Sequence, residues 1–203
     1  MRVKICGITR AEDALSAERA GADAIGLIFA NSKRRVGLEQ AAAIGAALGP
    51  FTVRVGVFVN APLELVEAAV EAAGLQAVQL HGKEDAAYAE NLMARVPVIK
   101  AVAVGPGFDA AAWRDFPAQA LLVDGLLPGS GEPFDWEWAA GLREFPRLIL
   151  AGGLTSQNVA AGIRSLRPYA VDVASGVESS PGIKDEERVQ EFVRAARAAW
   201  LSP

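Results

Sequence analysis

The sequence predicts an α/β fold, a single-domain (βα)8 TIM barrel with few insertions over residues 1–203. Three observations carry this prediction. Short runs rich in β-branched residues recur eight times, segments with helical periodicity lie between them, and the 203 residues allow about 25 for each unit. Because a closed barrel needs eight near-equal units and an open doubly wound sheet rarely does, we favour the barrel.

Each predicted strand ends in a small or polar residue. In chain order the strands are Arg2–Gly7, Ala24–Phe29, Val53–Val59, Ala77–His81, Val98–Val104, Ala120–Asp124, Leu148–Gly152 and Val171–Ser175. Because helical segments alternate with these strands throughout, we expect the strands to run parallel in one sheet. No linker, low-complexity tract or charge block interrupts the alternation.

Two of the predicted helices have clear ends. The segment Thr9-Arg10-Ala11-Glu12 is typical of a capping box, and Gly21 is expected to end the helix that this box begins. Asn60-Ala61-Pro62 is expected to begin a second helix, over Leu63–Ala73, which Gly74 ends.

The last predicted helix covers approximately Glu186–Leu201. Its helical spacing places five apolar residues on one face: Val189, Phe192, Val193, Ala196 and Trp200. This face is expected to pack against the barrel.

Composition excludes several classes of protein. Hydrophobic residues make up 52% and the net charge is −4, so a sizeable core is available and the basic face of a nucleic-acid binder is not. No apolar run reaches the roughly 20 residues of a membrane span, and no signal peptide precedes the first strand. The single cysteine forms no internal disulfide and fits a reducing compartment. We therefore expect a cytoplasmic protein with no nucleic-acid or membrane partner.

The active sites of such barrels lie at the C-terminal ends of the strands, so the polar residues there are the candidates. They are Cys6-Gly7, the segment from Asn31 to Arg35, Gln79-Leu80-His81-Gly82, Asp124-Gly125, Ala151-Gly152-Gly153 and Ala174-Ser175-Gly176. Loops after the seventh and eighth strands usually hold phosphate in these barrels, and glycines let backbone N–H groups approach an anion closely. Considered alone, each of these two loops is equally consistent with a tight turn that binds no phosphate.

The chain resembles the phosphoribosylanthranilate isomerase family in motifs that span nearly its whole length in the family's order. They are Lys4-Ile5-Cys6-Gly7-Ile8-Thr9, Gly26-Leu27-Ile28-Phe29 followed by Ser32-Lys33-Arg34, Val57-Phe58-Val59-Asn60, Val78-Gln79-Leu80-His81-Gly82, Phe134-Asp135-Trp136, Leu150-Ala151-Gly152-Gly153-Leu154, Ser175-Gly176-Val177-Glu178 and Pro181-Gly182-Ile183-Lys184-Asp185. Two segments depart from the family's pattern. Ala174-Ser175 stands where the family often has two serines, and Pro128-Gly129-Ser130-Gly131 stands where it usually has Gly-Gly-Thr/Ser-Gly.

The resemblance implies an internal redox isomerisation of an aminoaldose to a 1-amino-2-ketose, in tryptophan biosynthesis. One acid and one base suffice for this reaction, so no cofactor and no metal are expected. The resemblance assigns Asp124 as the general acid and Cys6 as the general base. On the residues alone, an Asp that caps a loop and a Cys that acts as a small buried hydrophobe are the alternatives.

The resemblance also implies the residues that bind a small phosphorylated substrate. Arg34 would hold the anthranilate carboxylate, with Arg35 as the competing candidate and a surface charge pair as the alternative. His81 would line the site near the acid or the sugar ring, or would be structural. The phosphate would be bound at the loops of the seventh and eighth strands, by Gly152, Gly153, Ser175 and Gly176. The chain is expected to be a monomer or a homodimer.

Rival functions fit the sequence less well. Indoleglycerol-phosphate synthase uses a catalytic lysine and an extra N-terminal segment, and a metal-dependent pentose-phosphate epimerase needs several histidine ligands where this chain has one. A histidine-pathway isomerase barrel would place an Asp where Cys6 stands. A non-enzymatic sensor of phosphorylated sugars is the rival from another class, and it would keep all its function without Cys6.

One further prediction comes from strand geometry. Alternate residues of a strand face the same way, so Lys4 should point into the barrel together with Cys6. Asp172 alternates with the apolar Val171 and Val173 on the last strand, which neighbours the first when the barrel closes. Because an isolated charge in this interior would be costly, Lys4 and Asp172 are expected to pair beneath the site.

Overall fold

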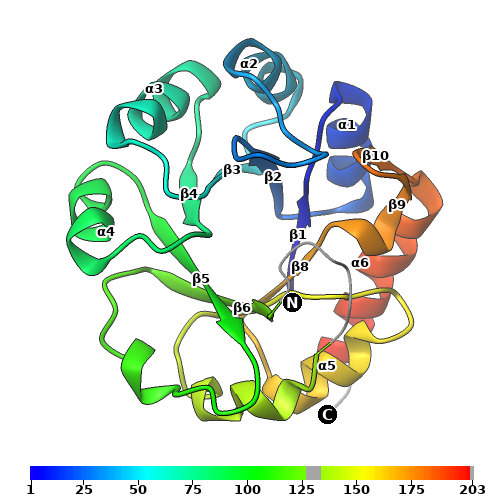
Figure 1. Ribbon diagram of the computed structural model, residues 1–203. Helices are drawn as coiled ribbons and strands as arrows, with labels where there is room; N and C mark the ends of the chain where they lie inside the picture. The colour runs from blue at the N-terminus through cyan, green and yellow to red at the C-terminus, as the bar shows by residue number, and fades with distance from the viewer. Residues whose placement is uncertain (127–133, 202–203) are drawn as a thin grey trace.

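Eight parallel strands close into a barrel in the computed structural model, which describes residues 1–126 and 134–201 (Figure 1). Each strand is hydrogen-bonded to the next, and the last pairs with the first. The strands are β1 (Arg2–Cys6), β2 (Ala24–Ile28), β3 (Val53–Phe58), β4 (Ala77–Leu80), β5 (Val98–Val104), β6 (Ala120–Gly125), β7 (Leu148–Leu150) and β8 (Ala170–Val173). The predicted (βα)8 barrel is therefore confirmed.

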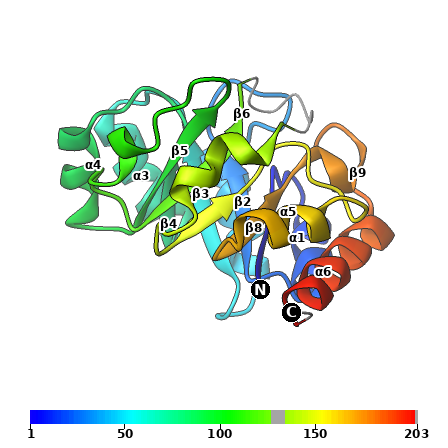
Figure 2. The ribbon, with the colours of Figure 1, turned by 90° about the horizontal axis from the view of Figure 1, so that it is seen from below.

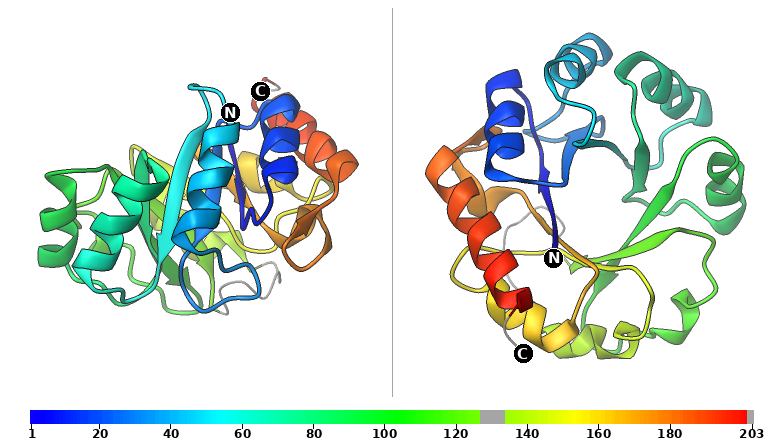
Figure 3. Two further views of the ribbon diagram at one scale, coloured as in Figure 1. Left: turned by 90° about the horizontal axis from the view of Figure 1, so that it is seen from above. Right: turned by 180° about the vertical axis from the view of Figure 1, so that it is seen from behind.

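Helices surround the barrel and alternate with its strands. The α-helices are α1 (Ala11–Ala20), α2 (Leu38–Ala47), α3 (Leu63–Ala73), α4 (Ala86–Met93), α5 (Val159–Leu166) and α6 (Glu186–Leu201). Helices α1, α5 and α6 lie side by side on one flank (Figure 2). The N-terminus and the end of α6 lie at the same end of the barrel (Figure 3), which leaves the C-terminal ends of the strands free to form a site.

The connections after β5 and β6 contain short 3-10 helices, η1 (Ala111–Trp113) and η2 (Trp136–Leu142). Pro106, Gly107 and Pro117 lie in the first of these connections, on either side of η1. After β8 the chain forms η3 (Ser175–Val177) and a small antiparallel hairpin of β9 (Glu178–Ser180) and β10 (Ile183–Lys184) before α6 begins.

The predicted capping box of the first helix is wrong. Helix α1 begins at Ala11, and Arg10 occupies the N-cap position without a side-chain cap. The Thr9 hydroxyl instead donates a hydrogen bond to the Gly182 carbonyl, because the β9–β10 hairpin is packed over this helix end. Gly21 does end the helix, in the left-handed conformation.

The predicted ends of the other two helices are confirmed, but one face residue is not. Leu63–Ala73 is followed by Gly74 in the left-handed conformation. Helix α6 buries Val189, Phe192, Val193 and Ala196 as expected, whereas Trp200 is 49% exposed and Ala199 is buried in its place. The cause is the position of Trp200 in the last turn, where Leu201 is also 82% exposed.

The core has two parts. Most buried apolar side chains fill the layer between the strands and the surrounding helices. A smaller cluster of Ala101, Ala120, Leu122, Ile149, Ala151 and Ala170 comes from the alternate residues of β5 to β8 and fills part of the barrel interior. Among the described residues, no helix has the length and apolar character that would let it cross a membrane.

Candidate active site

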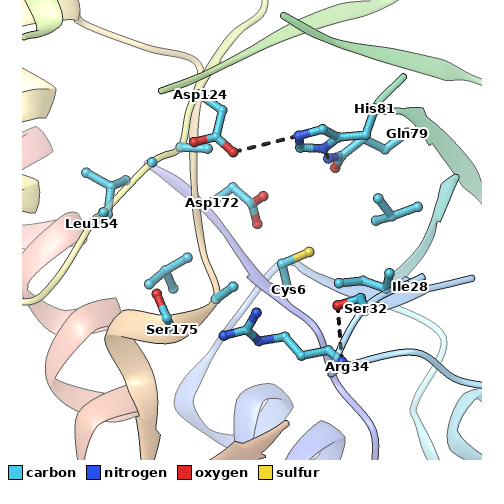
Figure 4. Close-up of a pocket in the computed structure, with 16 residues that line it drawn as sticks. Cys6, Ile28, Ser32, Arg34, Gln79, His81, Asp124, Leu154, Asp172 and Ser175 are labelled. Atoms are coloured by element: carbon cyan, nitrogen blue, oxygen red, sulfur yellow. Dashed lines mark hydrogen bonds and ion pairs between the residues drawn. The ribbon is translucent and has the colours of Figure 1, made fainter. Parts of the chain in front are cut away.

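A pocket opens at the C-terminal ends of the strands (Figure 4). It collects residues from β1 to β4, β6 and β8 and from the segments that follow β2, β4, β7 and β8. Its lining consists of Cys6, Ile28, Ser32, Arg34, Val57, Gln79, His81, Asp124, Ala151, Gly152, Gly153, Leu154, Asp172, Val173, Ala174 and Ser175. Seven of the eight residues expected to act on or bind substrate thus lie together.

The eighth, Gly176, is not among the lining residues. It is packed against the loop after β7, and a β-carbon at this position would lie 2.0 Å from the Leu154 carbonyl oxygen. Gly176 therefore allows the loops after β7 and β8 to approach each other. Arg35, the alternative to Arg34, is exposed and also lies outside the lining. The expected loop Pro128-Gly129-Ser130-Gly131 falls outside the described residues.

Asp124 lies near the end of β6 and is only 9% exposed. Burial raises the pKa of its carboxyl to about 6, although the Gly125 N–H donates to Oδ1 at 2.8 Å and opposes the shift. A carboxyl with this pKa keeps an appreciable protonated fraction near neutral pH. Asp124 can therefore donate a proton, as a general acid must.

Cys6 ends β1 and is buried at the floor of the pocket. Its Sγ lies against β2, where a β-carbon at position 26 would be 2.6 Å from the sulfur, so that Gly26 makes room for the thiol. Burial raises the pKa of the Cys6 thiol, and the charge of Lys4 opposes this effect. The free protein therefore holds Cys6 as a neutral thiol near pH 7.

The predicted ion pair beneath the site is confirmed. Lys4 and Asp172 stand opposite each other in the β1–β8 register, with Nζ 2.9 Å from Oδ1 and both side chains less than a tenth exposed. Burial would lower the pKa of Lys4, but Asp172 and Cys6 together raise it. Lys4 therefore stays charged below the Cys6 thiol.

Arg34 reaches the pocket, but part of its guanidinium is already engaged. Its Nε and one terminal nitrogen donate to the two carboxylate oxygens of Glu178 at 2.8 and 2.7 Å. The ammonium of Lys184 donates to the same carboxylate at 2.9 Å. Burial would raise the pKa of Glu178, but these two cations lower it below its usual range. One anion and two cations leave a net positive charge at this side of the pocket.

Sequence reasoning gave Glu178 and Lys184 no role, although both belong to motifs that it singled out. Glu178 is 144 residues from Arg34 along the chain, and only the fold of the β9–β10 hairpin brings the two together. An acidic residue within an otherwise small and apolar segment was the one signal available.

The loops after β7 and β8 line the opposite side of the pocket from Gln79 (Figure 4). Gly152 and Gly153 both have positive φ values, 80° and 60°, which glycine adopts without strain. Asn158 fixes the first loop, because its amide donates to the Gly153 carbonyl at 2.9 Å and accepts from the Thr155 N–H at 2.8 Å. Together with Ser175 these residues form a neutral, backbone-rich surface of the kind that binds phosphate.

His81 lines the pocket beside Asp124. Its Nε2 is 3.7 Å from Asp124 Oδ2, and its Nδ1 is 2.8 Å from the amide nitrogen of Gln79. Burial, reinforced by the charge of Lys4, lowers the pKa of His81. Among the described residues, no group of three or more His, Cys, Asp and Glu side chains is placed to hold a metal ion.

The chain is similar to known proteins over nearly its whole length. The family described as N-(5'phosphoribosyl)anthranilate (PRA) isomerase matches residues 3–195. An N-(5'-phosphoribosyl)anthranilate isomerase from Pelobacter propionicus is 45% identical over 202 residues, which cover 97% of this chain and 96% of that protein. One from Pseudomonas fluorescens is 50% identical over 204 residues, which cover 97% of this chain and 96% of that protein.

Solved structures show the same likeness. The phosphoribosyl anthranilate isomerase of Thermus thermophilus is 50% identical with a TM-score of 0.92, and the match covers 98% of this chain and 99% of that one. A second such isomerase, solved in complex with reduced 1-(o-carboxyphenylamino)-1-deoxyribulose 5-phosphate, is 42% identical with a TM-score of 0.89, and the match covers 98% of this chain and 99% of that one.

Proposed function

The chain belongs to the N-(5'-phosphoribosyl)anthranilate isomerase family, and from this premise we propose that Asp124 and Cys6 are the acid and base of its reaction. The reaction converts N-(5'-phosphoribosyl)anthranilate to 1-(2-carboxyphenylamino)-1-deoxyribulose 5-phosphate in tryptophan biosynthesis. The single observation that carries the assignment is the pocket itself, because a buried, readily protonated carboxyl and a buried thiol face one cavity above a charged lysine.

Asp124 opens the sugar ring. It donates its proton to the ring oxygen while the bond from that oxygen to C1 breaks, and the nitrogen lone pair forms a cationic imine at C1. The pKa of about 6 supports this role, because the carboxyl is protonated often enough to donate and becomes a stable carboxylate afterwards.

Cys6 then removes the proton from C2, and the electron pair of the C–H bond flows toward the cationic nitrogen to form the enamine. The thiol of the free enzyme is neutral because burial raises its pKa. The imine cation adds a positive charge to the one that Lys4 already supplies, and both favour loss of the thiol proton to water in the pocket, which leaves the thiolate. The base is therefore generated when the intermediate that needs it is present.

Two ends of the substrate carry negative charge, and the pocket has a complementary surface for each. We assign the anthranilate carboxylate to Arg34, which lines the cavity and belongs to a cluster of net positive charge with Glu178 and Lys184. The phosphate is placed at the loops of β7 and β8, on Gly152, Gly153 and Ser175, with Gly176 holding the loops together.

The family activity is tested by adding the purified chain to freshly made phosphoribosylanthranilate and following the loss of substrate fluorescence. Turnover that requires Cys6 is expected. Binding without turnover would instead indicate the sensor that the sequence left as the rival from another class.

The other expected properties of the chain are part of the proposal. It acts on a small phosphorylated molecule, without a cofactor or nucleic acid, in the cytoplasm, as a monomer or a homodimer. A 41% identical isomerase from Thermotoga maritima is described as dimeric and has been converted to monomers, which supports either state.

Inorganic phosphate is expected to compete with substrate, because the loops of β7 and β8 bind the phosphate group through backbone N–H groups. Initial rates measured with increasing phosphate should show a rising KM with unchanged kcat. Sodium chloride at matched ionic strength is the control, since general screening would act equally in both salts. A phosphate-soaked crystal with the anion elsewhere, together with no competition, would contradict this placement.

Glu178→Gln is expected to raise KM about 10-fold and to change kcat less. The substitution keeps the shape of the side chain but weakens the charge-assisted hydrogen bonds that hold Arg34 in place. Steady-state kinetics give the split between the two constants. Glu191→Gln, an exposed carboxylate on α6, is the control and should leave both unchanged.

A double-mutant cycle shows whether Glu178 acts through Arg34. In an Arg34→Met background, Glu178→Gln should add little further loss, since the guanidinium that it positions is gone. Additive effects of the two substitutions would mean that Glu178 only stabilises the hairpin.

A further inference from the structure

Three side chains form a row along one wall of the pocket: Gln79, His81 and Asp124 (Figure 4). Gln79 and His81 are two residues apart where β4 ends, so both face the interior. The Gln79 amide nitrogen is 2.8 Å from Nδ1 of His81, and Nε2 on the other side of the ring is 3.7 Å from Oδ2 of Asp124. The imidazole thus bridges a buried amide and the carboxyl of the proposed acid.

His81 is neutral near pH 7, because burial and the nearby charge of Lys4 lower its pKa. A neutral imidazole has one N–H donor and one nitrogen that accepts. Which nitrogen bears the proton decides what the ring offers to each neighbour, and the hydrogen bond at one nitrogen sets the state of the other.

The neighbours of His81 select one of these two tautomers. A carboxylate only accepts hydrogen bonds, so the nitrogen that faces ionised Asp124 must carry the proton. That nitrogen is Nε2, and Nδ1 must then accept from the NH2 group of Gln79. The reversed amide would make Nδ1 the donor and would turn a lone pair of the ring toward the carboxylate.

Gln79 is suited to hold this arrangement. It is 1% exposed, and within the described residues its Oε1 has no hydrogen-bond partner. The atom of the amide that faces Nδ1 is its nitrogen, so the NH2 group is oriented as a donor to the ring. A buried amide that forgoes one hydrogen bond to keep this contact indicates a role beyond packing.

We propose that Gln79 is a positioning residue that fixes His81 as the Nε2–H tautomer, so that the ring donates toward the carboxylate of Asp124. The proposal rests on the proposed function, in which Asp124 gives its proton to the ring oxygen of the substrate. As the new O–H bond forms and the ring C–O bond breaks, negative charge develops on Asp124. The Nε2–H group then closes on that carboxylate and stabilises it.

The tautomer is measured directly by 15N NMR. The ring-nitrogen signals need no assignment to a residue, because the chain has one histidine. Protonated and unprotonated ring nitrogens have widely separated 15N shifts. The wild-type protein at neutral pH should show a protonated Nε2 and an unprotonated Nδ1. In Gln79→Met, which keeps the length of the side chain and loses the amide, the two shifts should move toward each other as both tautomers become populated.

Gln76→Met is the matched control, because Gln76 is exposed and lies three residues before Gln79 on the outside of the barrel. It should leave the histidine spectrum unchanged. A wild-type spectrum with the proton on Nδ1 would overturn the proposal. So would a Gln79→Met spectrum identical to that of the wild type.

Kinetics then connect the tautomer to catalysis. Gln79→Met should lower kcat about 10-fold or more, as expected for the loss of one oriented donor to a charged group, with little change in KM. In a His81→Asn background the same substitution should cause no further loss of kcat. A further loss would mean that Gln79 acts only through packing. If the wild-type chain did not turn over substrate, the proposed function would be wrong. The NMR spectra would still show whether Gln79 fixes the tautomer of His81.

Discussion

Asp124→Asn is expected to lower kcat by about 100-fold or more while leaving the fold intact. The amide has nearly the same shape as the carboxyl but cannot donate the proton that the ring oxygen requires, and general acid catalysis is typically worth 10²–10⁴-fold. Cys6→Ala should cause a loss of the same order, through the missing base. Steady-state rates and thermal unfolding of each variant separate lost chemistry from lost structure.

The pH dependence of the wild type supplies the control. Asp124 acts in its protonated form and has a pKa of about 6, whereas Cys6 acts as the thiolate and has a raised pKa. Above pH 6 the gain in thiolate offsets the loss of the protonated carboxyl, so kcat/KM should stay level up to the pKa of the thiol and fall about tenfold for each pH unit below 6. In Asp124→Asn, kcat/KM should instead rise with pH, because only the thiolate is then required. Near-wild-type turnover in either variant, or an unchanged pH profile in Asp124→Asn, would assign the proton transfers to other groups.

Lys4→Met is expected to reduce the free energy of unfolding by about 3–5 kcal/mol. Lys4 and Asp172 form a buried pair, and removing one partner leaves an uncompensated charge in the barrel interior. Replacing both, as in Lys4→Met with Asp172→Leu, should restore much of the stability without restoring activity, since the positive charge below Cys6 is lost. Denaturant-induced unfolding of the two single variants and the double variant measures the effect.

A surface pair gives the matched control for this experiment. Arg143 and Glu137 are 2.6 Å apart, with side chains 42% and 64% exposed. Arg143→Met should cost at most about 1 kcal/mol, because water replaces the lost partner. Equal losses at the two pairs would show that burial does not set the cost at Lys4.

Strand periodicity carried the prediction of the fold and part of the site. The inward direction of Lys4 and Asp172 could be inferred because alternate residues share a face and the last strand of a closed barrel meets the first. The same reasoning brought Cys6, His81 and Asp124 to one end of the barrel. Their chemical roles came from the family resemblance, because spacing alone does not distinguish a catalytic thiol from a buried one.

What the sequence did not reveal depends on contacts between distant segments. The Thr9 hydroxyl follows the rule for a helix cap locally, but the Gly182 carbonyl, 173 residues away, is its partner. The sequence could not pair Glu178 with Arg34, because only the fold of the β9–β10 hairpin brings the two side chains together. Trp200 fits the helical pattern but lies in the last turn of α6, where its side chain is half exposed. Local rules fail in each case because a tertiary contact, or the lack of one, outweighs them.

The register between β1 and β8 has a consequence for how the protein folds. The pair that underlies the site joins residues 168 positions apart, so the loop-closure entropy of nearly the whole chain opposes its formation. During synthesis, the early βα units emerge and gain local structure long before β8 leaves the ribosome. Catalytic competence therefore arises last, in one closing event, and a chain released before β8 has no site.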